Sequence, residues 1–404
     1  MRVVIEKSRA HGEIYAPKSK SMAHRLLIAA GLAHGTSKIK GISECDDVLA
    51  TADCLRALGA TLVRDGDNIT VSGIDIREAV PSGTLHCRES GSTMRFFIPL
   101  ALTCGKKVRF HGEGRLPYRP MDIYEDICRE RGFMLSHDGE YIDVCGELCG
   151  GDYTVRGDVS SQFISGLLFA APVLDGDTRI HITGKIESRS YIDMTMYAMS
   201  LFGVVAVWEN ESTIFVKGNQ KYTAASVTVE GDFSGAVFID SLNLFGSDVK
   251  MRGLSDESLQ GDRVYRDILP RLCCGSPEID LADCPDLAPI LFALAAAKGG
   301  ATFTSTARLR IKESDRAAVM AEELEKFGAR LTVEENRVIV HKCELHAPTE
   351  TLLSHGDHRI VMALATLATV FGGEIEGAEA VSKSYPDYFN DITSLGIKVH
   401  IYEN

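Results

Sequence analysis

The sequence lacks the features that mark several large classes of protein. Lysine and arginine number 43 against 56 aspartates and glutamates, which gives a formal net charge of −13. A chain this acidic is not expected to bind nucleic acid through its overall electrostatic field. Tryptophan occurs once and aromatic residues make up 7% of the chain, so platforms on which bases could stack are also missing. We therefore expect no nucleic-acid partner.

Hallmarks of secretion and of membrane insertion are missing too. No apolar stretch is long enough to span a membrane, because proline, lysine or glycine interrupts the longest candidates. The 11 cysteines lack the spacing of a disulfide framework, which favours reduced thiols. The first seven residues have the pattern of a strand and not of a signal peptide. We therefore expect a cytoplasmic protein with no membrane partner.

Two familiar ligand-binding patterns are absent as well. Neither His-x-x-x-His nor Cys-x-x-Cys spacing occurs, so we expect no metal site and interpret His358 as a structural or hydrogen-bonding residue. The Gly-x-x-x-x-Gly-Lys-Ser/Thr spacing of a P-loop is also missing. Any binding of phosphate must therefore depend on other elements.

What the sequence does contain is an internal repeat. Short polar segments open apolar helices near residues 21, 91, 160, 233, 286 and 358, and all but one of the intervals are 69–73 residues long. Between the apolar helices lie amphipathic helices that end in glycine and lead into two strands of a hairpin. Each unit reads strand, apolar helix, strand, amphipathic helix, strand, strand. The fourth unit, near 269–280, is shorter and degenerate.

This repeat predicts an α/β (α+β) fold of two similar domains, each built from three βαβαββ units. A chain of 404 residues exceeds a typical single domain. Helices that are apolar on nearly all sides belong in a core, so we expect buried helices surrounded by sheets. We expect an N-terminal domain at 19–225 and a C-terminal domain at 1–18 plus 226–404, with the strand at 2–7 pairing in the latter. The alternative is a passive binding solenoid, which the irregular period and the varied chemistry of the helix openings disfavour.

The polar helix openings have the chemistry of anion sites. A helix start has unpaired N–H groups and a partial positive charge, so hydroxyl and ammonium groups placed there favour anion binding. Lys20 and Ser21 open the first helix, and Arg25 follows one turn later. Ser160-Ser161-Gln162 opens another helix, and Gly91 would let a ligand approach the backbone closely. Each feature also has a simpler interpretation, namely a solvated helix start, an N-cap or a tight turn.

Cations lie near these openings in both halves of the chain. Lys312 and Arg316 are four residues apart with Glu313 between them, a spacing that alone is typical of a solvated helix face. Asp286 either caps a helix or acts as a general base, with Glu313 as an acid nearby. The cations are Lys20, Arg25, Arg119, Lys312, Arg316, Arg359 and Lys383. Their number suits two separate anions held in a cleft between the domains.

Taken in order, these segments resemble one family over essentially the whole chain. The matching segments are Pro17–Ser21 with Arg25, Gly91–Arg95, Arg119-Pro120, Ser160–Gln162, Ser188–Asp193, Asp286, Lys312–Arg316, Asp357–Arg359 and Lys383–Tyr388. The family is that of the 5-enolpyruvylshikimate-3-phosphate synthases. The resemblance implies two domains, each an inside-out α/β barrel of three βαβαββ units, that close on the substrates. It also implies transfer of the enolpyruvyl group of phosphoenolpyruvate to the 5-hydroxyl of shikimate 3-phosphate, with release of phosphate, in the shikimate pathway of aromatic amino acid biosynthesis.

The resemblance further implies which side chains act on the substrates. Shikimate 3-phosphate would be held by Lys20, Ser21, Arg25, Ser160, Ser161, Gln162, Ser188, Asp286 and Lys312. Phosphoenolpyruvate would be held by Lys20, Gly91, Arg119, Gln162, Arg316, Arg359 and Lys383. Asp286 would accept the proton of the attacking hydroxyl, and either Lys20 or Glu313 would protonate C3 of phosphoenolpyruvate. No metal or organic cofactor is implied, and we expect a monomer.

Some positions and some rival functions qualify this resemblance. Arg308 stands where many members carry asparagine, so that contact is not carried over, and Gly91 is retained where glyphosate-tolerant members tend to carry alanine. The nearest rival is the enolpyruvyl transferase that acts on UDP-N-acetylglucosamine, which usually has Lys-Asn at the first opening and a cysteine on a mobile loop. Here Ser21 follows Lys20, and the segment 115–118 has no cysteine. Rivals of another class are a non-catalytic repeat scaffold and an RNA-end-processing protein of similar fold.

Overall fold

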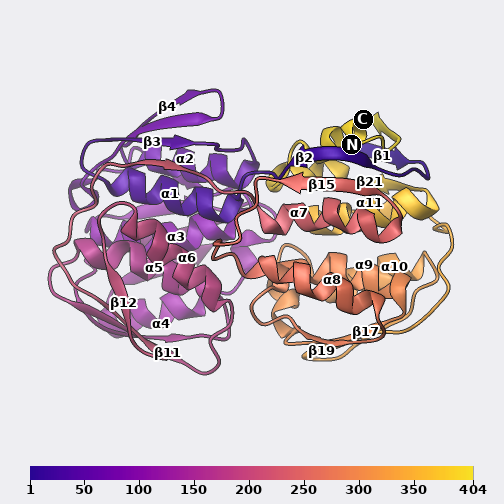
Figure 1. Ribbon diagram of the computed structural model, residues 1–404. Helices are drawn as coiled ribbons and strands as arrows, with labels where there is room; N and C mark the ends of the chain where they lie inside the picture. The colour runs from indigo at the N-terminus through magenta and orange to yellow at the C-terminus, as the bar shows by residue number, and fades with distance from the viewer. Residues whose placement is uncertain (404) are drawn as a thin grey trace. The chain divides into compact units, whose positions relative to one another are not determined.

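A computed structural model describes residues 1–403 as two compact units of mixed helices and strands (Figure 1). The N-lobe is Lys20–Glu230, and the C-lobe combines Met1–Ser19 with Gly231–Asn404. Both lobes are built from the α/β elements that the sequence predicts. No helix among the described residues combines the length and the apolar character that a bilayer span needs.

In the N-lobe, two helices alternate with strands three times. Its elements are α1 (Lys20–Leu32), β3 (Thr36–Lys40), α2 (Asp46–Ala57), β4 (Thr61–Asp65), β5 (Asn68–Ser72), β6 (Leu85–His86), α3 (Gly91–Thr103), β7 (Val108–His111), α4 (Asp122–Arg131), β8 (Met134–Asp138), β9 (Tyr141–Cys145), β10 (Gly151–Arg156), α5 (Ser161–Ala170), β11 (Thr178–Thr183), α6 (Arg189–Ser200), β12 (Ala206–Asn210), β13 (Thr213–Val216) and β14 (Ser226–Thr228).

The C-lobe repeats this alternation. Its elements are β1 (Arg2–Ile5), β2 (His11–Tyr15), α7 (Phe233–Asp240), β15 (Asp248–Arg252), α8 (Tyr265–Cys273), β16 (Glu278–Asp280), α9 (Ala288–Lys298), β17 (Ala301–Thr304), α10 (Arg316–Glu325), β18 (Leu331–Val333), β19 (Arg337–Val340), β20 (Leu352–Leu353), α11 (His358–Phe371), β21 (Gly373–Glu376), α12 (Tyr388–Ser394) and β22 (Val399–Tyr402). Short 3-10 turns precede several of the helices, among them Pro285–Leu287 before α9 and Ala307–Ile311 before α10.

The sheets have the strand order that the predicted unit produces. In β6-β7-β9-β8, the first two strands are parallel, and β9 pairs antiparallel with both β7 and β8. The sheets β10-β11-β13-β12 and β16-β17-β19-β18 follow the same order. A parallel pair needs a crossover helix whereas an antiparallel pair needs only a hairpin. The βαβαββ unit expected from the sequence is therefore confirmed in these sheets.

Three sheets depart from this pattern. Two of them take a strand from a distant part of the chain, and one has only two strands. β14 supplies the parallel edge of β14-β3-β5-β4, and β1 lies between β21 and β22 in the last sheet. β2 pairs only with β15, which confirms that the fourth unit is degenerate. The pairing of β14 with β3 keeps residues 226–230 in the N-lobe, whereas we expected the N-terminal domain to end at residue 225.

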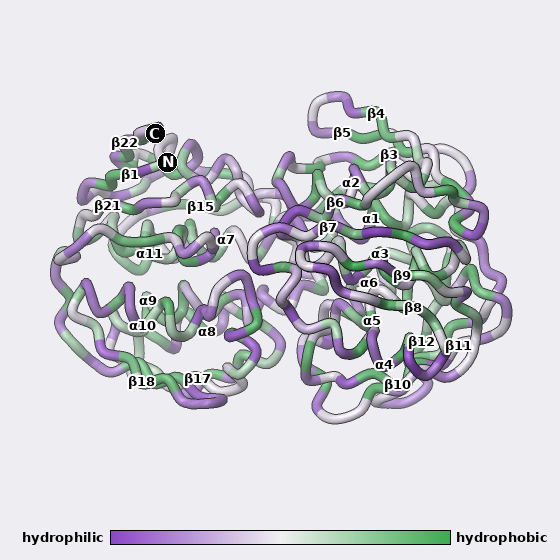
Figure 2. Tube along the Cα trace, turned by 180° about the vertical axis from the view of Figure 1, so that it is seen from behind, coloured by the Kyte–Doolittle hydropathy of each residue, from purple (hydrophilic) through white to green (hydrophobic). Residues whose placement is uncertain are grey.

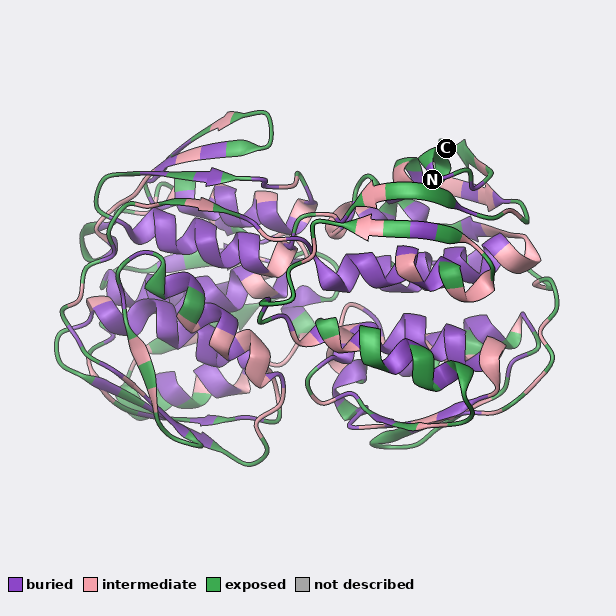
Figure 3. Cartoon of the chain, viewed as in Figure 1, coloured by how far each residue is buried: buried purple, intermediate pink, exposed green. Residues whose placement is uncertain are grey.

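The first helix of each unit forms the core of its lobe. α3 is buried along almost its whole length, and α9 is buried from Ala288 to Ala296. Buried residues dominate these helices in Figure 3, and hydrophobic colouring follows α9 and α11 in Figure 2. Because these helices bury every face, only their ends can offer polar groups to a ligand. The fold thus concentrates the chemistry at the helix openings.

A close approach of two core helices fixes the openings of α3 and α5. Gly166 of α5 packs against α3 so tightly that an added Cβ would overlap the carbonyl oxygen of Arg95 and the hydroxyl of Tyr124. That buried hydroxyl lies 2.7 Å from the carbonyl oxygen of Arg95 and 3.0 Å from that of Phe163. The spacing of the two helices therefore depends on the missing side chain at Gly166.

We predict that Gly166→Ala destabilises the protein. Alanine normally favours a helix over glycine by about 1 kcal/mol, but the overlap at this contact should reverse the sign and cost about 1–3 kcal/mol. Chemical denaturation followed by circular dichroism measures the change. Glu130→Ala, at an exposed position of α4, is the matched control. A variant as stable as the wild type, or more stable, would contradict the packing argument.

Candidate active site

The opening of α1 holds a lysine and an arginine in fixed positions. Nζ of Lys20 lies 2.8 Å from Oδ2 of Asp47. One turn later, Arg25 is buried and donates to the carbonyl of Ser21 at 2.7 Å and to the hydroxyl of Thr195 on α6 at 2.8 Å. Burial lowers the pKa of Arg25 to about 10. The α1 opening therefore brings together three of the predicted residues, Lys20, Ser21 and Arg25.

The openings of α3 and α5 meet through one amide side chain. Gln162 accepts from Nη1 of Arg95 at 2.7 Å, and its Nε2 donates to Oγ of Ser92 at 2.9 Å. A Cβ on Gly91 would lie 2.9 Å from Nη1 of Arg119 and 3.1 Å from Nη1 of Arg95. The absent side chain at Gly91 therefore lets two guanidinium groups approach the start of α3. Of the predicted residues, Gly91, Arg119 and Gln162 lie together here.

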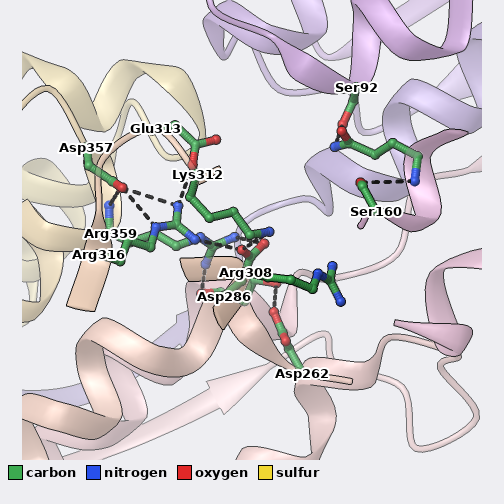
Figure 4. A network of polar contacts seen from close by, with 12 residues as sticks. Ser92, Ser160, Asp262, Asp286, Arg308, Lys312, Glu313, Arg316, Asp357 and Arg359 are labelled. Carbon is green, nitrogen blue, oxygen red and sulfur yellow. Dashed lines mark hydrogen bonds and ion pairs between the residues drawn. The ribbon is translucent and has the colours of Figure 1, made fainter. Parts of the chain in front are cut away.

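Three predicted serines lie at the starts of α5 and α6. The hydroxyl of Ser160 accepts from the backbone N–H of Gln162 at 3.3 Å and caps α5, and Figure 4 shows this contact together with the one at Ser92. Ser161 is buried within the first turn of α5. Ser188 precedes α6 with a φ of 57°, a left-handed conformation that is unusual for serine. Such backbone strain is often found at binding sites.

In the C-lobe, Asp286 lies among three cations. Its Oδ1 is 2.8 Å from Nη1 of Arg316 and 3.2 Å from Nζ of Lys312, and its Oδ2 is 2.9 Å from Nη2 of Arg359 (Figure 4). The sequence left open whether Asp286 caps a helix. Its carboxylate instead pairs with these cations, and no side-chain cap is found at the start of α9. Three predicted cations therefore converge on the carboxylate of a fourth predicted residue.

Arg316 is the most deeply buried member of this cluster. It also donates to Oε2 of Glu313 at 2.8 Å and to Oδ2 of Asp357 at 2.8 Å. Burial opposes its charge, but Asp357, Glu313 and Asp286 outweigh burial and raise the pKa of Arg316. In return, burial would raise the pKa of Asp357, but Arg316 lowers it below its usual value. Both groups therefore stay ionised, and Arg316 links three segments of the chain.

Lys312 differs from the two arginines because it can lose its charge near neutral pH. Burial is the largest cause that lowers its pKa, and together with the charges of Arg316 and Arg308 it brings the pKa to about 8 against the opposing effect of Asp286. Arg308 is itself buried in the turn before α10. Asp262 also borders the cluster (Figure 4): burial and then the charge of Asp286 raise its pKa to about 7.

The remaining predicted cations are Arg359, in the first turn of α11, and Lys383, at the end of the 3-10 turn Ala378–Lys383. Asp357 caps α11 by accepting from the backbone N–H of Arg359 at 2.9 Å. Nη1 of Arg359 also donates to the carbonyl of Ser234 at 3.3 Å. Nζ of Lys383 donates to the carbonyl of Gly356 at 2.6 Å. His358 is buried beside Asp357, which is compatible with the structural role expected for it.

Sequence reasoning missed several residues that hold these groups in place. Asp357 and Arg95 lie within the matching segments but were given no role, and Asp47 and Asp262 were not singled out. The signal available for Asp357 was its place immediately before a helix that begins with His358 and Arg359. An acidic residue at that place is a typical N-cap. Asp262 follows a serine-rich loop and offers no comparable pattern.

The family comparison covers nearly the whole chain. The model of the family described as EPSP synthase (3-phosphoshikimate 1-carboxyvinyltransferase) matches residues 4–275 and 274–392. A 3-phosphoshikimate 1-carboxyvinyltransferase from Clostridium kluyveri is 39% identical, over 98% of this chain and 97% of that protein. One from Clostridioides difficile is 36% identical, over 98% and 97%.

Solved structures share the fold at lower sequence identity. The EPSP synthase of Acinetobacter baumannii covers 100% of both chains with a TM-score of 0.80 and 22% identity. The enolpyruvyl transferase NikO of Streptomyces tendae covers 99% of this chain and 98% of its own, with a TM-score of 0.79 and 15% identity. These two likenesses support the fold alone, whereas the family model and the curated relatives extend to the sequence. The chain belongs to the EPSP synthase (3-phosphoshikimate 1-carboxyvinyltransferase) family.

Proposed function

We propose that this chain catalyses the reaction of its family, the transfer of the carboxyvinyl group of phosphoenolpyruvate to the 5-hydroxyl of shikimate 3-phosphate with release of phosphate. The observation that carries the proposal is the carboxylate of Asp286, held by Lys312, Arg316 and Arg359 within 2.8–3.2 Å. A phosphate-release assay with phosphoenolpyruvate and either acceptor tests it. Turnover with shikimate 3-phosphate supports the proposal, and turnover only with UDP-N-acetylglucosamine would reject it.

The cations around Asp286 explain how anions can be held. The substrate anion takes over Arg316 and Arg359, which in the free protein each donate one hydrogen bond to Asp286, because a phosphate or carboxylate can accept bidentate hydrogen bonds from a guanidinium group. Lys383 and, in the N-lobe, Lys20, Gly91, Arg119 and Gln162 complete the set for phosphoenolpyruvate. Shikimate 3-phosphate uses Lys20, Ser21, Arg25, Ser160, Ser161, Gln162, Ser188, Asp286 and Lys312. In this scheme each lobe supplies residues to both substrates.

The chemistry needs one acid and one base. Protonation of C3 makes C2 of phosphoenolpyruvate electrophilic, and the 5-hydroxyl attacks C2 while Asp286 accepts its proton. The tetrahedral adduct then loses a proton from the methyl carbon and expels phosphate, which regenerates the double bond. Lys20 or Glu313 supplies the first proton, and the neighbouring cations stabilise the charge that develops on the departing phosphate. This scheme needs no metal or organic cofactor.

The proposal also covers the oligomeric state, the location and the partners of the protein. We expect it to act as a monomer in the cytoplasm, without a nucleic-acid partner. The negative net charge supports the last point. All 11 cysteines are free in the structure, which suits a reducing compartment.

We predict that Asp286→Asn lowers kcat by about 10²–10⁴-fold, the usual contribution of a general base, because asparagine keeps the shape but cannot accept the proton. Steady-state phosphate release measures this effect, and the thermal midpoint checks folding. Asp283→Asn, three residues away and exposed, is the matched control. Near-normal kcat in Asp286→Asn would remove the assigned role.

We predict that kcat/KM for shikimate 3-phosphate falls as the pH rises through about 8. Lys312 is charged below its pKa of about 8 and neutral above it, so its attraction for the anionic acceptor is lost in alkaline solution. In Lys312→Arg this alkaline limb should move upward by more than one pH unit, since an arginine stays charged. pH–rate profiles of the two proteins give the comparison. Identical alkaline limbs would show that Lys312 is not the titrating group.

A further inference from the structure

A second buried charge cluster lies on α10, among residues that have no assigned part in catalysis. Glu323 is completely buried. Nζ of Lys326 lies 2.9 Å from both of its carboxylate oxygens, and the backbone N–H of Leu353 donates to Oε2 at 2.9 Å. Nε2 of His355 lies 2.9 Å from Oε1. Because a carboxylate only accepts, Nε2 of His355 carries the proton of this hydrogen bond.

This cluster holds one short segment of backbone. Lys326 donates to the carbonyl of Thr351 at 3.0 Å, so Glu323 and Lys326 together bind the segment 351–355 at three of its residues. His355 has a φ of 49°, a left-handed conformation that costs free energy in a residue other than glycine. The hydrogen bond to Glu323 therefore stabilises a conformation that the segment would otherwise avoid.

The side of α10 that carries Glu323 also contacts Asp357, which lies two residues after His355. Arg316 and Glu323 are seven residues apart, which places them two turns apart on one side of the helix. Arg316 binds Asp357 while Glu323 binds Leu353 and His355. The segment 351–357 is thus attached to α10 at two points.

Two residues assigned to phosphoenolpyruvate, Arg359 and Lys383, contact the residues at the end of this segment. The carbonyl of Gly356 accepts from Lys383 at 2.6 Å, and Asp357 orients the start of α11, where Arg359 lies. A shift of residues 353–355 would therefore move both the Gly356 carbonyl that Lys383 contacts and the backbone of Arg359.

We propose that Glu323 is a positioning residue for phosphoenolpyruvate binding, which it serves by fixing the segment 353–356 on α10. This inference rests on the proposed function, in which Arg359 and Lys383 hold that substrate. A buried ion pair is weak evidence for a stabilising role, because two apolar side chains of similar volume are often as favourable. A carboxylate that binds one backbone N–H and one imidazole supplies directional contacts that an apolar pair cannot.

The first test uses two variants and one matched control. Glu323→Gln keeps the shape but weakens the contacts to Lys326 and His355. A double variant, Glu323→Met with Lys326→Met, removes both charges so that neither is left buried alone. Glu322→Gln is the control. Glu322 is exposed, and one of its carboxylate oxygens lies within 4.8 Å of a carboxylate oxygen of Glu323 and of a ring nitrogen of His355. KM for phosphoenolpyruvate, kcat and the affinity for shikimate 3-phosphate alone are measured for each.

We expect KM for phosphoenolpyruvate to rise about ten- to hundredfold in both Glu323 variants, the usual effect of a displaced binding group. The affinity for shikimate 3-phosphate should stay within about twofold of the Glu322→Gln control, since most of the residues assigned to that substrate lie in the N-lobe. A loss shared equally by both substrates, or an unchanged KM in folded variants, would overturn the proposal.

Hydrogen exchange separates this inference from the proposed function. In the double variant, backbone amides of 352–357 should exchange at least tenfold faster, while those of α3 keep the wild-type rate. If wild-type protein shows no turnover with shikimate 3-phosphate, the proposed function fails, and the exchange result still decides whether Glu323 holds the segment. Unchanged exchange at 352–357 would overturn the inference by itself.

Discussion

A buried guanidinium that must be neutralised organises the cluster of charged side chains around Asp286 in the C-lobe. Arg316 is almost entirely excluded from solvent, so its charge has to be compensated by neighbouring carboxylates. Asp286, Glu313 and Asp357 provide this compensation from three separate segments. Each of these segments ends at or near a helix start. The requirement to pair one charge therefore fixes the relative positions of several helix openings, and through them the positions of Lys312 and Arg359.

The repeated unit places each opening at the start of a buried helix but gives the openings different chemistry. In the N-lobe, hydroxyls, an amide and a glycine surround the starts of α3 and α5, and the arginines approach through the gap left by Gly91. In the C-lobe, carboxylates and cations dominate. Because the apolar helices bury all their faces, function can vary only at their ends without disturbing the core. One architecture can thus bind two different anions and also supply a base.

The sequence allowed the repeat and most helix starts to be predicted, because capping and hydrophobic period are local properties. α3 begins at Gly91 and α11 at His358, as the residues indicated. Contacts between distant segments were not accessible in this way. The partners Arg316 and Asp357 are 41 residues apart, and no local pattern identifies such a pair. The same reason applies to residues 226–228, since only their long-range pairing with β3 shows that they lie with the N-lobe.

The central claim is that Asp286 neutralises the cations that a substrate anion later occupies. Calorimetric titration of phosphoenolpyruvate into the unliganded wild type and into Asp286→Asn tests this claim most directly. We expect tighter binding to Asp286→Asn, because the competing carboxylate and its repulsion are both removed, although that variant turns over slowly. Weaker binding of phosphoenolpyruvate to Asp286→Asn than to the wild type would contradict it.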